Sequence, residues 1–249
     1  VNVTESGNLV YQWYKNTSNS TSGGQKITGA VGNTYTIPAG DVTTSLNNTY
    51  YYCIITQSYG NATNTLTSSV AGLNVIAGVS ITANPTAQSV IEGNTAVFSV
   101  TATGAGDLSY QWYSNKNNSN TGGTKITNAT SSTYTTNAVT TAMNGTYYYC
   151  VVTQKYGSST AEVSSNTAML TVGAKVKVTT NPSAQNMIVG NKATFTVSAV
   201  GDGDLSYQWY VNGTNSTNGG SPISGANTST YTTSATTTDM SGKYYYCVI

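Results

Sequence analysis

Three cysteines carry the most reactive side chains of this sequence, and they recur at a fixed interval. Cys53, Cys150 and Cys247 follow one another every 97 residues, each directly after a run of three tyrosines. A catalytic thiol needs a neighbouring base, and the sequence contains no histidine. We therefore expect no catalytic thiol, and two roles stay open: a buried thiol that packs as a small apolar side chain, or an intermolecular disulfide.

Carboxylates and lysines offer little further chemistry. The segment Asp202-Gly203-Asp204 resembles part of a calcium-binding loop, but it supplies too few oxygen ligands, so a turn is expected there. Lys26 and Lys125 recur in a GGxKIT motif, whereas Pro222 stands at that place in the third occurrence, which argues against a repeated lysine–asparagine crosslink. We expect no enzymatic activity, no metal site and no cofactor.

Asparagines in Asn-x-Ser/Thr triplets are a frequent modification signal in this chain. A sequence so rich in Asn, Ser and Thr contains many such triplets by chance, but several of them fall in the same turn after each tryptophan. We predict N-glycosylation in exposed loops, on an archaeal surface. The candidate residues are Asn2, Asn16, Asn19, Asn47, Asn61, Asn117, Asn128, Asn144, Asn212, Asn215 and Asn227.

The composition narrows the class of protein. Of the 249 residues, 38% are hydrophobic and 20 are tyrosines, so the chain can bury hydrophobic cores. Charged residues make up 7% and the net charge is +1, which gives no electrostatic footprint for nucleic acid or an anionic membrane. No apolar run is long enough to span a membrane, and no signal peptide is visible. With so few titratable groups, stability should change little between neutral and mildly acid pH.

The tyrosine and tryptophan motif around each cysteine indicates tandem copies of one domain. Tyr-Gln-Trp-Tyr begins at Tyr11, Tyr110 and Tyr207, always ahead of a Tyr-Tyr-Tyr-Cys run. We expect one complete domain at 77–174, a first domain at 1–76 without its opening strands, and a third at 175–249 without its last strand. The sequence is then a window from a longer repeat array, or neighbouring subunits supply the missing strands.

Within the complete copy, short segments alternate apolar and polar residues and are separated by Gly, Asn, Ser and Pro. Thr, Val and Tyr dominate these segments, as is typical of half-buried strands. About seven short strands in just under 100 residues predict a two-sheet sandwich, so the fold class is all-β. The predicted strands are 79–83, 95–103, 108–114, 124–126, 132–136, 147–155 and 161–172.

A tryptophan on one strand and a Tyr-x-Cys motif on a later one resembles the immunoglobulin fold in all three copies. The form LSYQWY…GGTKITNATSSTYTT…YYYCVVT is similar to immunoglobulin-like tandem repeats of archaeal and bacterial cell-surface and secreted proteins. The resemblance implies that Trp13, Trp112 and Trp209 pack in the core against Cys53, Cys150 and Cys247. The family's second cysteine is replaced by Val100 and Val197, so no disulfide can form within a copy.

Strand alternation divides the tyrosine-rich segments between the two faces of a sheet. If the tryptophans and cysteines point inward, a stripe of tyrosines points outward in each copy. Three uses stay open for it: simple cross-strand pairing, lateral contact between proteins, or stacking on sugar rings. The predicted binding or assembly face consists of Tyr14, Tyr50, Tyr52, Tyr113, Tyr147, Tyr149, Tyr210, Tyr244 and Tyr246.

Links of about three residues between copies predict a stiff rod of domains. Taken together, these features predict an extracellular structural repeat protein that forms the shaft of a surface filament, stalk, sheath or adhesin. Its partners would be other copies of itself. The alternatives are a carbohydrate- or protein-binding module, with surface glycans as partners, and a non-catalytic spacer of a larger extracellular enzyme.

Overall fold

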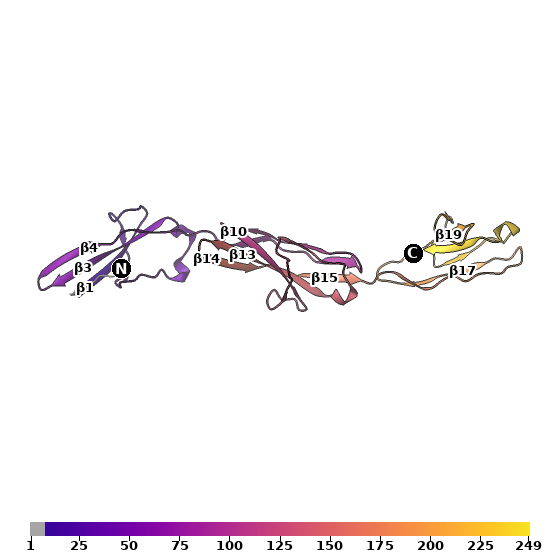
Figure 1. Cartoon of the computed structure of the whole chain (residues 1–249), viewed down its shortest axis with the longest axis horizontal. Helices are drawn as coiled ribbons and strands as arrows, with labels where there is room; N and C mark the ends of the chain where they lie inside the picture. Colours follow the sequence, from indigo (N-terminus) through magenta and orange to yellow (C-terminus); the bar gives the residue numbers. More distant parts are fainter. Residues whose placement is uncertain (1–7) are drawn as a thin grey trace. The chain divides into compact units, whose positions relative to one another are not determined.

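The computed structural model describes residues 8–249, and Asn2 lies outside these residues. The described chain is built from β-strands and four short 3-10 turns (Figure 1). We refer to residues 8–76, 77–174 and 175–249 as copies 1, 2 and 3. Packing divides the chain differently, into two compact units. The first unit contains the chain up to Ser80 together with residues 104–107 and 154–161, and the second unit contains all other residues. The division into three domains therefore stays a prediction.

Copy 2 contains both sheets of a β-sandwich. In the larger sheet the strand order is β11-β10-β13-β15-β7, and β14 also pairs with β13. These strands are β7 (Gln88–Ile91), β10 (Asp107–Asn115), β11 (Thr124–Lys125), β13 (Thr146–Tyr156), β14 (Ser159–Ser164) and β15 (Ala168–Gly173). The opposite layer consists of two pairs, β12 (Thr133–Thr135) with β8 (Val97–Ser99), and β6 (Ser80–Ala83) with β9 (Thr101–Thr103).

Copy 1 contains one sheet, in the order β2-β1-β3-β4, with β5 also paired to β3. Copy 3 contains three small sheets, in which β16 pairs β18, β17 pairs β21, and β19 lies between β20 and β22. The strands of copy 1 are β1 (Asn8–Asn16), β2 (Gln25–Lys26), β3 (Thr49–Tyr59), β4 (Ala62–Thr67) and β5 (Ala71–Leu73). Those of copy 3 are β16 (Lys177–Thr180), β17 (Thr194–Thr196), β18 (Ser198–Val200), β19 (Gln208–Asn212), β20 (Ser221–Pro222), β21 (Thr230–Thr232) and β22 (Tyr244–Val248). The 3-10 turns are η1 (Ala39–Asp41), η2 (Thr44–Leu46), η3 (Thr141–Met143) and η4 (Thr238–Met240).

The all-β prediction is confirmed, and beyond shifts of one or two residues at the strand ends, the predicted strands differ from the observed ones in three places. Segment 95–103 is two strands, because its pairing changes from β12 to β6 around Val100. Segment 161–172 is also two strands, interrupted where the Ser165 hydroxyl accepts the Cys150 N–H at 2.9 Å and donates to the Asn166 carbonyl at 2.8 Å. The third difference is β7, which the sequence analysis missed.

The core of copy 2 forms around Trp112. Its side chain is fully buried, and the ring centroid lies 6.4 Å from that of Phe98 and 6.1 Å from that of Tyr134. The indole N–H donates to the Ser131 carbonyl at 2.9 Å, so the one polar atom of the ring is satisfied. Trp209 is equally buried and packs on Phe195 at 6.3 Å in copy 3. Trp13 is only half-buried, because no described residue of copy 1 takes the place of Phe98.

Candidate interaction surface

Two tyrosines on neighbouring strands stack face to face in every copy. The pairs are Tyr14 with Tyr52, Tyr113 with Tyr149, and Tyr210 with Tyr246. The ring centroids lie 5.3, 5.2 and 5.1 Å apart and the planes meet at 6°, 10° and 8°. Such cross-strand pairs stabilise a sheet by up to about 1 kcal/mol. The same face is therefore built in the same way three times.

The second ring of each pair lies under a glycine of the loop that follows the tryptophan strand. The backbone N–H of Gly123 donates to the Tyr149 hydroxyl at 3.1 Å. A Cβ atom on Gly24, Gly123 or Gly220 would come within 3 Å of the ring beneath it. As a result Tyr52 is only 2% exposed and Tyr149 only 3%.

These two tyrosines correct the sequence-based interpretation of the outward face. Strand alternation places Tyr52 and Tyr149 on the outer side of the sheet, but the double-glycine loop of the same copy covers them. They cannot bind another molecule without displacing that loop. Tyr246 also lies under the double-glycine loop of its copy, but it is only half-buried. The rings that keep open surface and do not lie under that loop are Tyr14, Tyr50, Tyr113, Tyr147 and Tyr210, all half-buried, and Tyr244, which is 44% exposed; we call these six the tyrosine face.

Two exposed tyrosines were missed by the sequence analysis. Tyr59 is 83% exposed and Tyr156 is 46% exposed, and they occupy equivalent positions at the ends of β3 and β13. Each precedes a glycine with positive φ, Gly60 at 59° and Gly157 at 57°, which turns the chain into the next strand. The signal that could have found them is the Tyr-Gly dipeptide whose tyrosine lies six residues after Cys53 and six residues after Cys150.

The cysteines are free thiols. Cys53 and Cys150 are fully buried, as expected for thiols that pack against tryptophan, and Cys247 is half-buried. The Cys150 sulfur donates to the Val151 carbonyl at 3.6 Å. Burial raises the pKa of the Cys150 thiol to about 11, and those of Cys53 and Cys247 also rise. A buried, protonated thiol is a poor nucleophile, and Cys53 and Cys150 cannot reach a partner chain while folded.

Stability should fall at alkaline pH because of Cys150 and Tyr148. Burial raises their pKa values from 9.0 to about 11 and from 10.0 to about 12. At a pH between the unfolded and folded pKa values, the unfolded chain loses a proton that the folded chain keeps. The stability that these protonated groups give the folded chain is therefore complete below pH 9, and it is lost gradually as the pH rises to about 12. Allowing for screening by water, each group contributes about 1 to 2 kcal/mol. Urea unfolding should show a plateau below pH 9 and a decline above it, which Cys150→Ala should reduce; an unchanged midpoint up to pH 11 would contradict this.

The candidate glycosylation residues have different environments. The amide nitrogen of Asn16 donates to the carbonyls of Ser20 and Ser22 at 2.9 and 3.0 Å. Asn212 makes the equivalent bonds in copy 3, and so does Asn115, which is not in a triplet, so this asparagine holds the loop together. The other described candidates are exposed: Asn19, Asn47, Asn61, Asn117, Asn128, Asn144, Asn215 and Asn227. Two of them also make a hydrogen bond through the side-chain oxygen. Asn47 accepts the Val75 N–H at 3.1 Å, and Asn144 accepts the Val172 N–H at 2.9 Å.

If the folded chain is glycosylated, modification should occur at Asn19 and Asn215 and not at Asn16 and Asn212. An N-linked sugar replaces an amide hydrogen, and both of these hydrogens are engaged within the loop at Asn16 and Asn212. Glycopeptide mass spectrometry of the protein from its native source measures occupancy at each residue. Asn19→Gln should remove one glycan, whereas Asn16→Gln should remove none; full occupancy of Asn16 would contradict this assignment.

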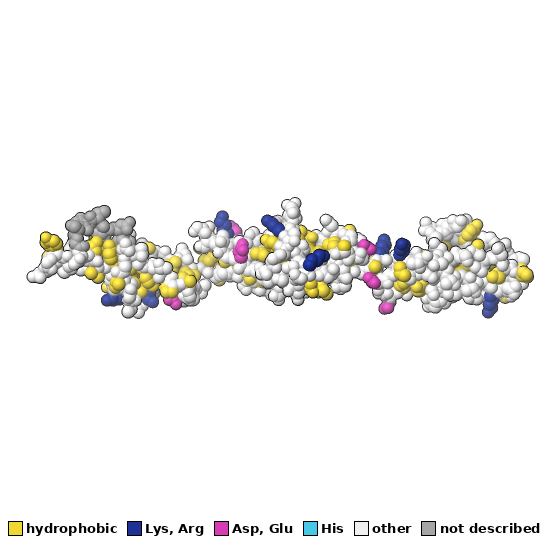
Figure 2. Space-filling model, turned by 90° about the horizontal axis from the view of Figure 1, so that it is seen from below, with side chains coloured by type: hydrophobic (Ala, Val, Ile, Leu, Met, Phe, Trp, Pro, Cys, Tyr) yellow, Lys and Arg dark blue, Asp and Glu magenta, His cyan; other side chains and the backbone are white. Residues whose placement is uncertain are grey.

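Charged and metal-binding chemistry is sparse in the described residues. No three His, Cys, Asp or Glu side chains among residues 8–249 are placed to hold a metal ion. Asp202 lies at a bend and holds a distant segment of the chain: its carboxylate accepts the Ala174 N–H at 2.7 Å, and its own N–H donates to the Ala174 carbonyl. On the face shown in Figure 2, charged side chains are few. No helix in the described part of the chain has the length and apolar character needed to cross a bilayer.

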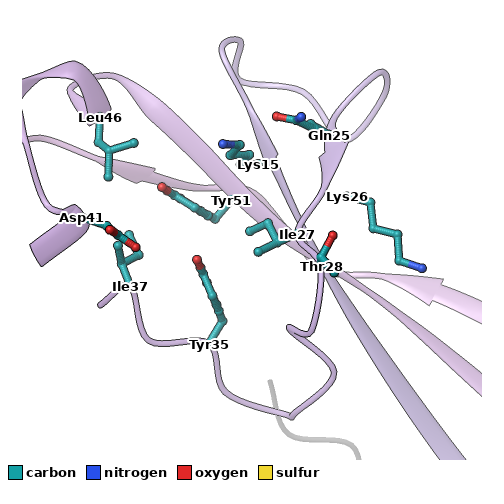
Figure 3. A pocket seen from close by; sticks show the side chains of 10 residues that line it. All are labelled: Lys15, Gln25, Lys26, Ile27, Thr28, Tyr35, Ile37, Asp41, Leu46 and Tyr51. Carbon is teal, nitrogen blue, oxygen red and sulfur yellow. The ribbon is translucent and has the colours of Figure 1, made fainter. Parts of the chain in front are cut away.

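A pocket of about 310 Å³ opens beside Tyr51 and Tyr35 in copy 1 (Figure 3). Ile37 and Leu46 line its apolar side, and Lys15 and Asp41 also contribute to its wall. In copy 2 the tyrosine equivalent to Tyr51 is Tyr148, and the ring of Phe98 stacks on it at 4.6 Å. No described residue of copy 1 covers Tyr51 as Phe98 covers Tyr148, so the inner face of this sheet is left open. We therefore interpret the pocket as this uncovered face and not as a ligand site that recurs in each copy.

Comparison with known families agrees with an immunoglobulin-like architecture for copy 2. Residues 80–153 match the family model described as an immunoglobulin domain. No curated protein matches the chain. Among solved structures, the three N-terminal domains of the bacteriophage RB49 Highly Immunogenic Outer Capsid protein are 18% identical, with a TM-score of 0.45, covering 97% of this chain and 80% of that one. The I67–I69 I-band fragment of titin is 12% identical, with a TM-score of 0.47, covering 96% and 82%, and extracellular domains 3–5 of Drosophila OTK are 16% identical, with a TM-score of 0.39, covering 96% and 83%.

Proposed function

We propose that this chain is an extracellular, non-catalytic structural protein that forms the shaft of a filament, stalk, sheath or adhesin on an archaeal or bacterial surface. The observation that carries the proposal is the threefold repetition of one outer face, with its stacked tyrosine pair at 5.1 to 5.3 Å. A face that recurs with the sequence period suits contact with an equally periodic partner, which is another copy of the same chain.

The stacked pairs prepare the tyrosine face for such a contact. Because the loop glycine fixes Tyr149, the ring of Tyr113 rests on a rigid support and loses little conformational freedom on binding. Tyr147 lies opposite Met169 on β15, and Met169 is 38% exposed. Tyrosine and methionine are both enriched in protein interfaces. We place the lateral contact on Tyr113 and Tyr147 in copy 2 and on the equivalent residues of the other copies.

Electron microscopy of the protein isolated without denaturants tests this function. We expect ordered filaments or sheets in which Tyr147 is buried by a neighbouring chain. Tyr147→Ser should weaken lateral association, whereas Tyr156→Ser, which changes an exposed tyrosine outside the face, should leave it intact. Single particles of the wild-type chain under all conditions, with the tyrosine face open, would refute the lateral contact.

A ligand-binding role is the second candidate, and Tyr59 and Tyr156 favour it. Exposed rings at equivalent strand ends, 83% and 46% exposed, can stack on sugars of a host or partner surface. Glycan-array binding by the full chain measures this directly. Loss of a glycan signal in Tyr59→Ser and Tyr156→Ser, with Tyr147→Ser unchanged, would assign adhesion to these rings. The non-catalytic spacer alternative predicts neither assembly nor a glycan signal.

A further inference from the structure

β4 of copy 1 is a strand with one free edge. Its six residues pair with β3, and no other strand among residues 8–249 pairs with it. All six are exposed, and none of them is charged, a proline or a glycine. A free edge presents a row of unpaired N–H and C=O groups that can accept a further strand, and proteins usually protect such an edge with a charge or a proline. The edge of β4 therefore has neither of these protections.

This open edge does not depend on where the sequence starts. In copy 2, whose opening strands β6 to β9 are all present, the equivalent strand β14 lies 97 residues further on and also pairs with β13 alone. The first four residues of β14 are exposed as well. The opening strand β7 pairs with β15 and not with β14. An equivalent of β7 in copy 1 would therefore lie along β5 and leave β4 open.

The register between β3 and β4 determines which backbone groups of β4 face outward. The Ser68 N–H donates to the Cys53 carbonyl at 2.9 Å, and the ladder continues from this pair. Hydrogen-bonded and non-hydrogen-bonded pairs alternate along an antiparallel ladder, so every second residue of β4, beginning with Leu66, bonds to β3. The residues whose N–H and C=O groups point away from the sheet are Thr63, Thr65 and Thr67.

This Thr-x-Thr-x-Thr pattern is complementary to itself. If two β4 strands meet antiparallel across a twofold axis at Thr65, then Thr65 faces Thr65 of the other chain, and Thr63 faces Thr67. These pairs would exchange about six backbone hydrogen bonds, and opposed threonines stabilise a sheet further. Copy 3 contains such an opposed pair within the chain, because the hydroxyls of Thr194 and Thr232 lie 3.1 Å apart across β17 and β21.

The equivalent strand β14 is not suited to the same contact, because of one residue. Glu162 stands where β4 has Thr65. Glu162 is exposed, and its carboxylate accepts a hydrogen bond from the Thr153 hydroxyl at 2.9 Å. Pairing β14 with itself in the same register would place two Glu162 carboxylates directly opposite each other, which is destabilising. A charge on an edge strand is a common protection against such pairing. Of these two edges, only β4 is therefore suited to pairing with itself.

We propose that β4 is an interaction surface whose partner is β4 of a second chain, paired antiparallel with Thr65 on the twofold axis. The contact uses the same patch on both chains and closes as a dimer. Thr65 pairs with Thr56, which strand alternation places on the same side of the sheet as Tyr52. The joined sheet would thus carry the outer faces of both chains on one side. The inference rests on the proposed function only in that the chain meets other copies of itself, and its contact is separate from the tyrosine face.

Charge exchange at Thr65 tests this contact by sedimentation velocity of the full chain at rising concentration. Thr65→Glu and Thr65→Lys should each weaken self-association by about tenfold or more, because like charges then oppose each other at the axis. An equimolar mixture of the two variants should restore association, since Glu then faces Lys. Both variants should fold with an unchanged urea midpoint, because Thr65 is exposed and its backbone groups do not bond to β3. Val200→Glu and Val200→Lys are the matched controls, because Val200 is 57% exposed and lies on β18.

The outcomes separate this contact from the proposed function. Two variants that stay dissociated when mixed would overturn the symmetric register. A Thr65→Lys chain that associates more strongly than the wild type would assign the partner of β4 to β14, where the new lysine would face Glu162. Filaments and self-association that persist in Thr65→Glu and are lost in Tyr147→Ser would keep the proposed function and refute the edge contact. Charge exchange that still controls association in the Tyr147→Ser chain would support the edge contact without the lateral one.

Discussion

Trp112→Ala is expected to cost about 3 to 5 kcal/mol of the unfolding free energy of copy 2, which is typical of removing a large aromatic side chain from a core. The ring is fully buried, contacts Phe98 and Tyr134, and donates its N–H to the Ser131 carbonyl. Alanine would leave a cavity between the sheets and that carbonyl without its donor. Urea unfolding followed by circular dichroism, with hydrogen exchange to localise the loss, measures the change.

Trp13→Ala provides the matched comparison within the same chain. Trp13 is half-buried, and its indole N–H donates to the Gly32 carbonyl at 2.9 Å, just as Trp112 donates to Ser131. Because less apolar surface is covered there, the loss should be clearly smaller than for Trp112→Ala. Equal losses at the two positions would mean that packing against Phe98 contributes little.

The architecture was predictable because its strongest signals are local and periodic. The interval of 97 residues reveals the tandem copies, and strand alternation places Trp112 and Cys150 on the inner side of one sheet, where both are fully buried. Tyr113 and Tyr149 follow by the same rule on the other side, and they do stack there at 5.2 Å. Side-chain direction along a strand depends only on position, so it can be deduced from the sequence alone.

The features that escaped prediction depend on contacts between distant segments. β7 pairs in parallel with β15, about 80 residues further along the chain, and its four residues Gln-Ser-Val-Ile carry no distinct strand signal of their own. The burial of Tyr149 depends on a loop 26 residues earlier that turns back over the ring. Alternation gives the side of the sheet on which a residue lies, and only the folded loops decide whether that side is open to solvent.

Gly123→Ala should destabilise copy 2 by about 1 to 3 kcal/mol, the cost of overpacking a filled space. A Cβ atom at this position would lie 2.8 Å from the Ser114 carbonyl oxygen and 2.8 Å from Cε1 of Tyr149. The backbone oxygen belongs to the tryptophan strand and cannot move without disturbing it, so the loop must lift. Lifting the loop also breaks the hydrogen bond from the Gly123 N–H to the Tyr149 hydroxyl. The measurement is the urea midpoint together with the solvent exposure of Tyr149, followed by fluorescence quenching.

Gly213→Ala is the control, because a Cβ atom there meets nothing within 4 Å, in the same loop of copy 3. Combining Gly123→Ala with Tyr149→Ala then separates the two contacts in a double-mutant cycle. If the ring is the main obstacle, the glycine substitution becomes much less costly once the ring is removed; if the Ser114 carbonyl dominates, the two losses add. A Gly123→Ala variant as stable as Gly213→Ala would mean that the loop does not hold the ring closed. Tyr52 and Tyr149 would then count as part of the tyrosine face through which chains associate.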